Sequence, residues 1–181
     1  MDIDVYLTRG LNSLAGHWVL LDGAMLVFSK PFIFILVLTI AARWFVRTNR
    51  DVQRHIAASC GLAVIAGLAL NQFILLFFDR VRPYDLGITH LIVEKSGDPS
   101  FPSDHATLAF AIAFLLVLKR DRLTWIYLLF AGLVGFARVY TGIHFLTDVL
   151  GGAVVGLIAS YAVHKLYLPD SKLNRLVTRI L

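Results

Sequence analysis

The segment with the clearest chemical content is 100–107, which reads SFPSDHAT and lies between a polar loop and a long apolar run. Pro102 and Ser103 predict that a helix begins here, because proline ends an extended approach and serine is a favoured N-cap. The first N–H groups of a helix have no intrahelical partner, and the helix dipole adds positive charge at that end. We therefore expect this segment to bind an anion such as phosphate, with His105 placed to donate or accept a proton.

A second histidine, His144, lies four residues before an aspartate, Asp148. If a helix begins near His144, this spacing places both side chains on one face, so that Asp148 can accept the imidazole N–H. Such a carboxylate fixes the tautomer, leaves the other ring nitrogen free to attack, and stabilises the positive charge that develops on the ring. The pair therefore predicts a nucleophilic histidine.

Arginines flank both segments. Arg82 precedes Pro83, which disfavours helical geometry at Arg82 and lets the guanidinium leave the helix toward a substrate. Arg138 lies six residues before His144, and a planar guanidinium suits bidentate contact with phosphate. The residues expected to act on a phosphate are, as ligands, Arg82, Ser103 and Arg138 and, as catalytic groups, His105, His144 and Asp148.

The alternative chemistry for the two histidines and Asp148 is metal binding. Few further carboxylates lie beside them in the sequence, and the arginines already supply positive charge. We therefore expect a site without metal or cofactor. In the predicted reaction, His144 attacks phosphorus and His105 protonates the leaving oxygen. Water then hydrolyses the phosphohistidine with His105 acting as a base.

The composition is that of an integral membrane protein, with 58% hydrophobic and 16% charged residues among 181, which is the length of one domain. Net charge is +5, but the basic residues fall in short clusters between apolar runs, so nucleic acid is not expected as a partner. Cys60 is the single cysteine and excludes an intrachain disulfide. The acidic start, Met-Asp-Ile-Asp, argues against a cleaved signal peptide.

We expect an all-α bundle of five transmembrane helices forming one domain over residues 1–181. The apolar runs predict spans over 31–46, 56–78, 106–118, 123–136 and 147–163. The apolar piece 18–28 is too short to span alone, so we expect it to be interfacial or a half-buried entry to the first span. The alternatives are a single long kinked helix from Trp18 onward, or a sixth span formed by 18–28. Ile3, Leu7, Leu11 and Leu14 recur at helical spacing and predict a short amphipathic helix lying on the membrane.

Two further features of the bundle can be predicted. Gly152 and Gly156 form a small-xxx-small face, which allows the helix that carries Asp148 to pack closely against a neighbour. The polar loop 84–101 lies between predicted spans and could cover the site.

The distribution of lysine and arginine predicts the orientation in the membrane. Eleven of the seventeen lie in the segments 43–54, 119–122 and 165–181, all on one side of a five-span chain. The positive-inside rule places these segments in the cytoplasm, so the N-terminus and all three motifs lie outside. Arg82, the segment 100–107 and the segment from Arg138 to His144 then meet at similar depth, which independently favours one shared site.

These three segments together resemble the signature of the type 2 phosphatidic acid phosphatase superfamily. The matching residues are Arg82 and Pro83, then Pro102, Ser103 and His105, then Arg138, His144 and Asp148. The resemblance covers about residues 60–165, with the signature itself at about 75–150. The FPSDHAT wording and the small size are most similar to the bacterial undecaprenyl diphosphatase branch, which implies a multi-pass protein of the bacterial inner membrane with its site facing the periplasm.

Three positions depart from the family pattern. Leu75 stands where the family carries a lysine seven residues before Arg82, Asp104 replaces a glycine, and Ala137 replaces a serine. The missing lysine removes one phosphate ligand, and Arg80 is a candidate substitute if the helix ends before it. Asp104 is expected to point away from the phosphate, toward an N–H or an arginine, because two anions repel.

The resemblance implies a lipid phosphatase that removes the terminal phosphate of a lipid phosphate or pyrophosphate, with undecaprenyl diphosphate as the preferred substrate. Phosphatidylglycerol phosphate, phosphatidic acid and a lipid A phosphate remain open as substrates. The alternative from another class is a transporter or head-group binder. Binding would need only the arginines, whereas turnover would need the pair of His144 and Asp148.

Overall fold

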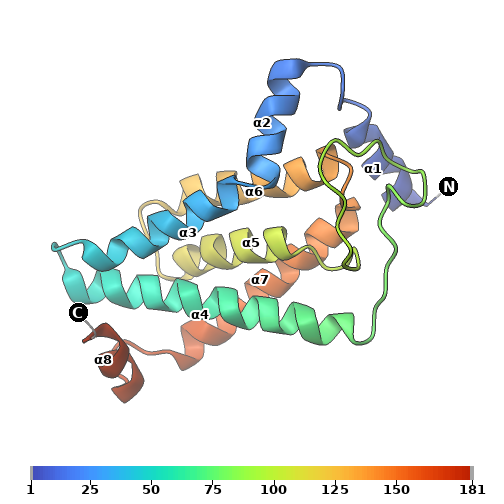
Figure 1. The fold of residues 1–181 in the computed structure, drawn as a ribbon. Coiled ribbons are helices and arrows are strands. Elements are labelled where there is room, and N and C mark those ends of the chain that lie inside the picture. Colours follow the sequence, from blue (N-terminus) through green and yellow to red (C-terminus); the bar gives the residue numbers. More distant parts are fainter. Residues whose placement is uncertain (1, 180–181) are drawn as a thin grey trace.

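The computed structural model describes residues 2–179, and over that range all regular structure is helical (Figure 1). Its elements are α1 (Ile3–Asn12), α2 (Val19–Ser29), α3 (Phe32–Ala42), the 3-10 turn η1 (Arg43–Phe45), α4 (Arg50–Leu75), α5 (Asp104–Leu118), α6 (Thr124–Tyr140), α7 (Leu146–Leu166) and α8 (Lys172–Thr178). The all-α prediction is therefore confirmed for the described part of the chain. The predicted spans correspond to α3 with η1, α4, α5, α6 and α7.

The five expected membrane crossings are not all confirmed by the lengths of the helices. Among residues 2–179, α4 and α7 are long and apolar enough to cross a membrane. The apolar helices α2 and α3 with η1 meet at a bend of 49° and would form a third, broken span. Helices α5 and α6 are apolar but have only 15 and 17 residues, below the roughly 20 that a bilayer core needs. By length and composition, two or three of the five expected spans are thus long enough to cross a membrane.

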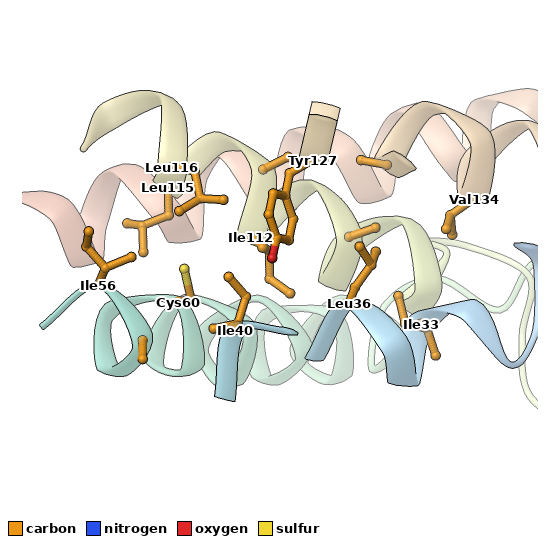
Figure 2. Close-up of a cluster of buried hydrophobic side chains, with 14 residues drawn as sticks. Ile33, Leu36, Ile40, Ile56, Cys60, Ile112, Leu115, Leu116, Tyr127 and Val134 are labelled. Carbon is orange, nitrogen blue, oxygen red and sulfur yellow. The ribbon is translucent and has the colours of Figure 1, made fainter. Parts of the chain in front are cut away.

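Helix α5 is the centre of the bundle and packs against α4, α6 and α7. Figure 2 shows a cluster of apolar side chains around it that fills the space between α3, α4 and α6. Its members include Ile33, Leu36, Ile40, Ile56, Cys60, Ile112, Leu115, Leu116, Tyr127 and Val134. Cys60 is fully buried in this cluster, so it acts as a small packing residue.

The close approach of α5 and α7 depends on two glycines. A Cβ atom on Gly152 would lie 2.6 Å from the carbonyl oxygen of Ser103, and one on Gly156 would lie 2.8 Å from the backbone N of Ala111 and O of Thr107. The prediction of a small-residue face is therefore confirmed. This contact places the first turns of α5 and α7, which carry the signature residues, side by side.

Helix α1 is amphipathic, as expected, but its polar face is turned toward the protein. Asp4, Thr8 and Asn12, spaced by four, are buried, whereas Ile3 and Tyr6 are mostly exposed. The amide of Asn12 donates to the carbonyls of Tyr140 (2.8 Å) and His90 (2.9 Å) and accepts from the His90 N–H (2.7 Å). The polar stripe therefore satisfies backbone groups at the end of α6 and in the loop 76–103, while Ile3 and Tyr6 on the apolar face stay exposed.

The two ends of the bundle differ in what they hold (Figure 1). Helix α8 and the turns that join α3 to α4 and α5 to α6 lie at one end, where Arg43 forms a buried bidentate pair with Asp121 at 2.6 and 2.9 Å. Helix α1 and the loop 76–103 lie at the other end, beside the start of α7. The basic segments counted in the sequence thus gather at the end opposite to the three signature segments.

We expect Gly156→Ala to destabilise the protein, because the new methyl group would meet backbone atoms of α5 that cannot move independently. Overpacking of this kind costs about 1 to 3 kcal/mol. Gly132→Ala on α6 is the matched control, since nothing lies within 4 Å of its Cβ position and alanine is the better helix former. Thermal unfolding in detergent should show a lower Tm for Gly156→Ala and an unchanged or higher Tm for Gly132→Ala. Equal Tm values would contradict the tight α5 and α7 contact.

Candidate active site

A cavity of about 210 Å³ opens at the α1 end of the bundle. Four of the sequence-predicted residues line it together, although they come from three different segments: Arg82, His105, Arg138 and His144. The rest of the lining is Gln72, Leu75, Ser96, Asp98, Pro99, Pro102 and Asp104. Residues 96–99 belong to the loop 76–103, so this loop forms part of the cavity wall, as the sequence suggested.

His144 is oriented by a backbone carbonyl as well as by Asp148. It lies in the turn between α6 and α7, two residues before α7 begins, so the two side chains do not share a helix face as predicted. Its Nδ1–H donates to the carbonyl of Ser100 at 2.9 Å, whereas Asp148 Oδ2 lies 3.5 Å away. Because a carbonyl can only accept, Nδ1 carries the proton, and Nε2 of the neutral ring keeps its lone pair.

Asp148 is fully buried in the first turn of α7 and holds several groups at once. Its Oδ2 accepts from the Ser100 hydroxyl at 2.5 Å and from the Phe145 N–H at 2.8 Å. Its Oδ1 accepts from Arg80 at 2.6 Å. Ser100 was part of the motif in the sequence but had no predicted role. The structure makes it the link between Asp148 and His144.

The free nitrogen of His144 faces two cations. Nε2 lies 3.4 Å from Nη1 of Arg82 and 3.4 Å from Nη2 of Arg138. The pKa of His144 is lowered to about 4, chiefly by burial, with Arg138 and Arg82 lowering it and Asp148 raising it. The ring is therefore neutral near pH 7, which is the form that can attack an electrophile.

Arg82 is fixed by the loop that follows α4. It donates to the carbonyls of Asp98 (2.8 Å), Pro99 (3.3 Å) and Ile143 (3.0 Å), and to the Ser96 hydroxyl at 3.3 Å. Helix α4 ends at Leu75, earlier than predicted, so Arg82 leaves the helix as Pro83 suggested. These contacts use four of its five N–H groups, and the fifth, on Nη1, lies against His144 Nε2 at the cavity.

Arg138 is in the last turn of α6 and is held by a residue that the sequence did not reveal. Its Nη1 donates to the carbonyl of Ser29 at 2.8 Å, at the bend between α2 and α3. No feature of the sequence pointed to Ser29. The Nε of Arg138 and the hydroxyl of Ser103 are both buried and have no partner among the described residues. Unpartnered buried polar groups are costly, and a bound phosphate would satisfy them.

Ser103 stands at the N-cap of α5, as predicted, but its hydroxyl does not cap the helix. Its backbone N–H donates to the carbonyl of Asp148 at 3.1 Å. The hydroxyl and the first-turn N–H groups of α5 are therefore available to an anion at the positive end of the helix dipole. Asp104 accepts from the amide of Asn71 at 2.7 Å, rather than from a backbone N–H or an arginine.

The cavity also shows the effect of the departure at Leu75. This apolar side chain is part of the lining, at the position where the sequence pattern leads one to expect a lysine. Arg80, the candidate substitute, is not part of the lining. Its guanidinium donates to Asp4, Thr147 and Asp148 behind the His144 turn, so the geometry favours a role outside the cavity.

With the geometry established, comparisons with known proteins give a consistent result. Residues 56–171 match the family model of the PAP2 superfamily. The chain is 31% identical over 153 residues to the undecaprenyl-diphosphatase BcrC of Bacillus subtilis (strain 168), covering 84% of this chain and 78% of that protein. The family match over 56–171 contains every residue that lines the cavity and all of the signature positions.

Two crystal structures are similar over nearly the whole chain. One is a transmembrane PAP2-type phosphatidylglycerolphosphate phosphatase from Bacillus subtilis, with a TM-score of 0.68 and 27% identity, covering 93% of this chain and 86% of that one. The other is Aquifex aeolicus LpxE, with a TM-score of 0.71 and 26% identity, covering 91% and 96%. The fold of this chain is therefore shared with a transmembrane PAP2-type phosphatase.

We expect Leu75→Lys to strengthen the binding of inorganic phosphate, because it adds a cation to a cavity that Arg82 and Arg138 already line. A hydrogen bond to a charged group contributes about 1.5 to 3 kcal/mol, which corresponds to about a tenfold or larger fall in the dissociation constant. Leu75→Met is the matched neutral control. Isothermal titration with phosphate measures both variants. Equal affinities for the two would show that residue 75 does not reach the anion.

Proposed function

The chain belongs to the PAP2 superfamily of membrane lipid phosphatases, and we propose that it removes the terminal phosphate of undecaprenyl diphosphate through a phosphohistidine on His144. The observation that carries the proposal is the position of His144 Nε2, unprotonated and 3.4 Å from each of two arginines. A nucleophile between two fixed cations is suited to attack on a phosphoryl group, whose oxygens the cations would hold.

In the proposed reaction, Arg82, Arg138 and the first turn of α5 bind the phosphoryl oxygens. His144 Nε2 forms a bond to phosphorus as the bond to the bridging oxygen breaks, and His105 gives its proton to the departing lipid phosphate. The Ser100 carbonyl and Asp148 stabilise the imidazolium that His144 becomes. Water then attacks the phosphohistidine with His105 as the base, which releases inorganic phosphate and restores both histidines.

We propose that this chemistry needs no metal ion. Within residues 2–179, no group of three or more His, Cys, Asp or Glu side chains is arranged to hold one. The positive charge that a phosphoryl transition state requires is supplied by Arg82, Arg138 and the N-terminus of α5.

The choice of undecaprenyl diphosphate rests on the similarity to the Bacillus subtilis undecaprenyl-diphosphatase. Phosphatidylglycerol phosphate is the second candidate, because one of the similar crystal structures is of a phosphatidylglycerolphosphate phosphatase. Both substrates present a terminal phosphate to the same cavity. They differ in the group that leaves, a lipid phosphate in the first case and an alkoxide in the second.

A panel of purified lipids tests this proposal. We expect the detergent-solubilised protein, in excess EDTA, to release phosphate faster from undecaprenyl diphosphate than from phosphatidylglycerol phosphate or phosphatidic acid. His144→Ala should reduce release by at least a thousandfold, because it removes the nucleophile. Denaturation of the wild type in alkaline SDS, with the substrate radiolabelled in its terminal phosphate, should trap label on the protein, because a phosphohistidine is stable in base, and His144→Ala should trap none.

Other results of the lipid panel would contradict the substrate, the metal-free reaction or the nucleophile separately. Faster release from phosphatidylglycerol phosphate would favour the second substrate and leave the mechanism intact. Release that requires added Mg²⁺ or Zn²⁺ would refute the metal-free reaction. Binding of these lipids with no release from any of them would make the protein a head-group binder. Phosphate release by His144→Ala near the wild-type rate would refute the assignment of His144 as the nucleophile.

We further propose that the site faces the outside of a bacterial inner membrane. The cavity is lined in part by the loop 76–103. This loop lies at the α1 end, and the segments with eleven of the seventeen basic residues lie at the α8 end (Figure 1). The positive-inside rule assigns the α8 end to the cytoplasm. A substrate on the outer leaflet would then reach the cavity directly.

Cysteine labelling in intact cells tests this orientation. In a Cys60→Ser background, Leu86→Cys lies in the exposed part of the loop 76–103, and Lys172→Cys lies on the exposed face of α8. We expect an impermeant maleimide to label Leu86→Cys in intact cells and to label Lys172→Cys only after lysis. The reverse pattern would place the cavity in the cytoplasm.

A further inference from the structure

Helix α1 caps the helix that carries Asp148. The first residues of α7 have N–H groups without intrahelical partners, and the N-cap position is Phe145, whose side chain cannot accept a hydrogen bond. The Thr8 hydroxyl accepts from the Leu146 N–H at 3.0 Å, and Asp4 Oδ1 accepts from the Thr147 N–H at 3.0 Å. A segment at the start of the chain thus supplies the cap that α7 lacks.

Arg80 joins Asp4 to Asp148. Asp4 Oδ2 accepts from Arg80 Nη2 at 2.7 Å and from the Thr147 hydroxyl at 2.5 Å. Arg80 Nη1 donates to Asp148 Oδ1 at 2.6 Å, and its guanidinium stacks over the Phe145 ring at 3.9 Å. Both terminal nitrogens of Arg80 are therefore engaged by carboxylates, and the stack fixes the plane of the guanidinium.

We propose that Asp4 and Arg80 are positioning residues of the phosphatase site, acting through Asp148 on the orientation of His144. The inference rests on the proposed function of His144. It assigns to Arg80 a role that differs from that of a phosphate ligand, and to α1 a role that no signature motif contains. Asp4 fixes the guanidinium of Arg80, and Arg80 holds and neutralises the buried carboxylate of Asp148.

Electrostatics explains why the two residues would act together. Asp4 and Asp148 are both buried, and a buried carboxylate without a counterion is costly. Arg80 lies between the two carboxylates and forms an ion pair with each of them. Without Arg80, Asp148 would lose its strongest partner. The Asp148 contacts to the Ser100 hydroxyl and the Phe145 N–H, which frame the His144 turn, would then be less well fixed.

Steady-state kinetics separates this role from that of a phosphate ligand. With farnesyl diphosphate as the probe substrate, we expect Arg80→Ala to lower kcat at least tenfold and to leave KM within about twofold. Arg80→Lys should recover part of the kcat lost in Arg80→Ala, because lysine restores the positive charge but not the two terminal nitrogens of the guanidinium. Asp4→Asn should lower kcat by a smaller factor. Asp2→Asn is its matched control, since Asp2 caps α1 and is not among the described partners of Arg80.

Double variants test whether the effect passes through Asp148. In an Asp148→Ala background, Arg80→Ala should change kcat less than twofold, and in an Arg80→Ala background, Asp4→Asn should be silent. Full additivity in either background, or a rise in KM and in the inhibition constant of inorganic phosphate with kcat unchanged, would overturn the proposal. The Tm of each variant in detergent shows whether a loss of kcat is due to unfolding.

The failure of this inference is distinguishable from failure of the proposed function. If His144→Ala abolishes turnover while Arg80→Ala and Asp4→Asn are kinetically silent, the phosphatase assignment holds and the positioning role is refuted. If the wild type releases no phosphate from the probe or from the lipid panel, the phosphatase assignment itself is refuted.

Discussion

The buried carboxylate of Asp148 is the constraint on which the rest of this site depends. It is fully excluded from solvent, so each of its lone pairs needs a donor, and the protein supplies them from the Ser100 hydroxyl, the Phe145 N–H and Arg80. These donors come from separate parts of the chain. Satisfying one charge therefore ties the segment before α5, the turn before α7 and the loop after α4 into a single arrangement.

That arrangement explains how a polar site can exist at one end of an apolar bundle. The membrane-facing body is held by apolar packing around α5 and by the glycine contact between α5 and α7. That contact brings the first turns of the two helices together. The arginines are then bound mainly by loop and helix-end carbonyls, and both line the cavity beside His144.

Helix α1 also satisfies buried polar groups near the site. An amphipathic helix at a membrane surface usually turns its polar face to water. Here Asp4, Thr8 and Asn12 face the bundle and satisfy backbone groups at the ends of α6 and α7, while Ile3 and Tyr6 are left exposed. The reason is that helix ends near the site leave polar groups that neither lipid nor the bundle core can satisfy.

Local signals in the sequence determined the helical class, the helix start at Ser103, the departure of Arg82 from its helix at Pro83, and the close packing at Gly152 and Gly156. Each follows from backbone preference or side-chain size over a few residues. Only the tertiary structure decided which groups meet. The Ser100 carbonyl on His144, Ser29 on Arg138 and Asp4 on Arg80 join residues that are between 44 and 109 positions apart. No local spacing can encode such contacts, because they depend on how the helices pack.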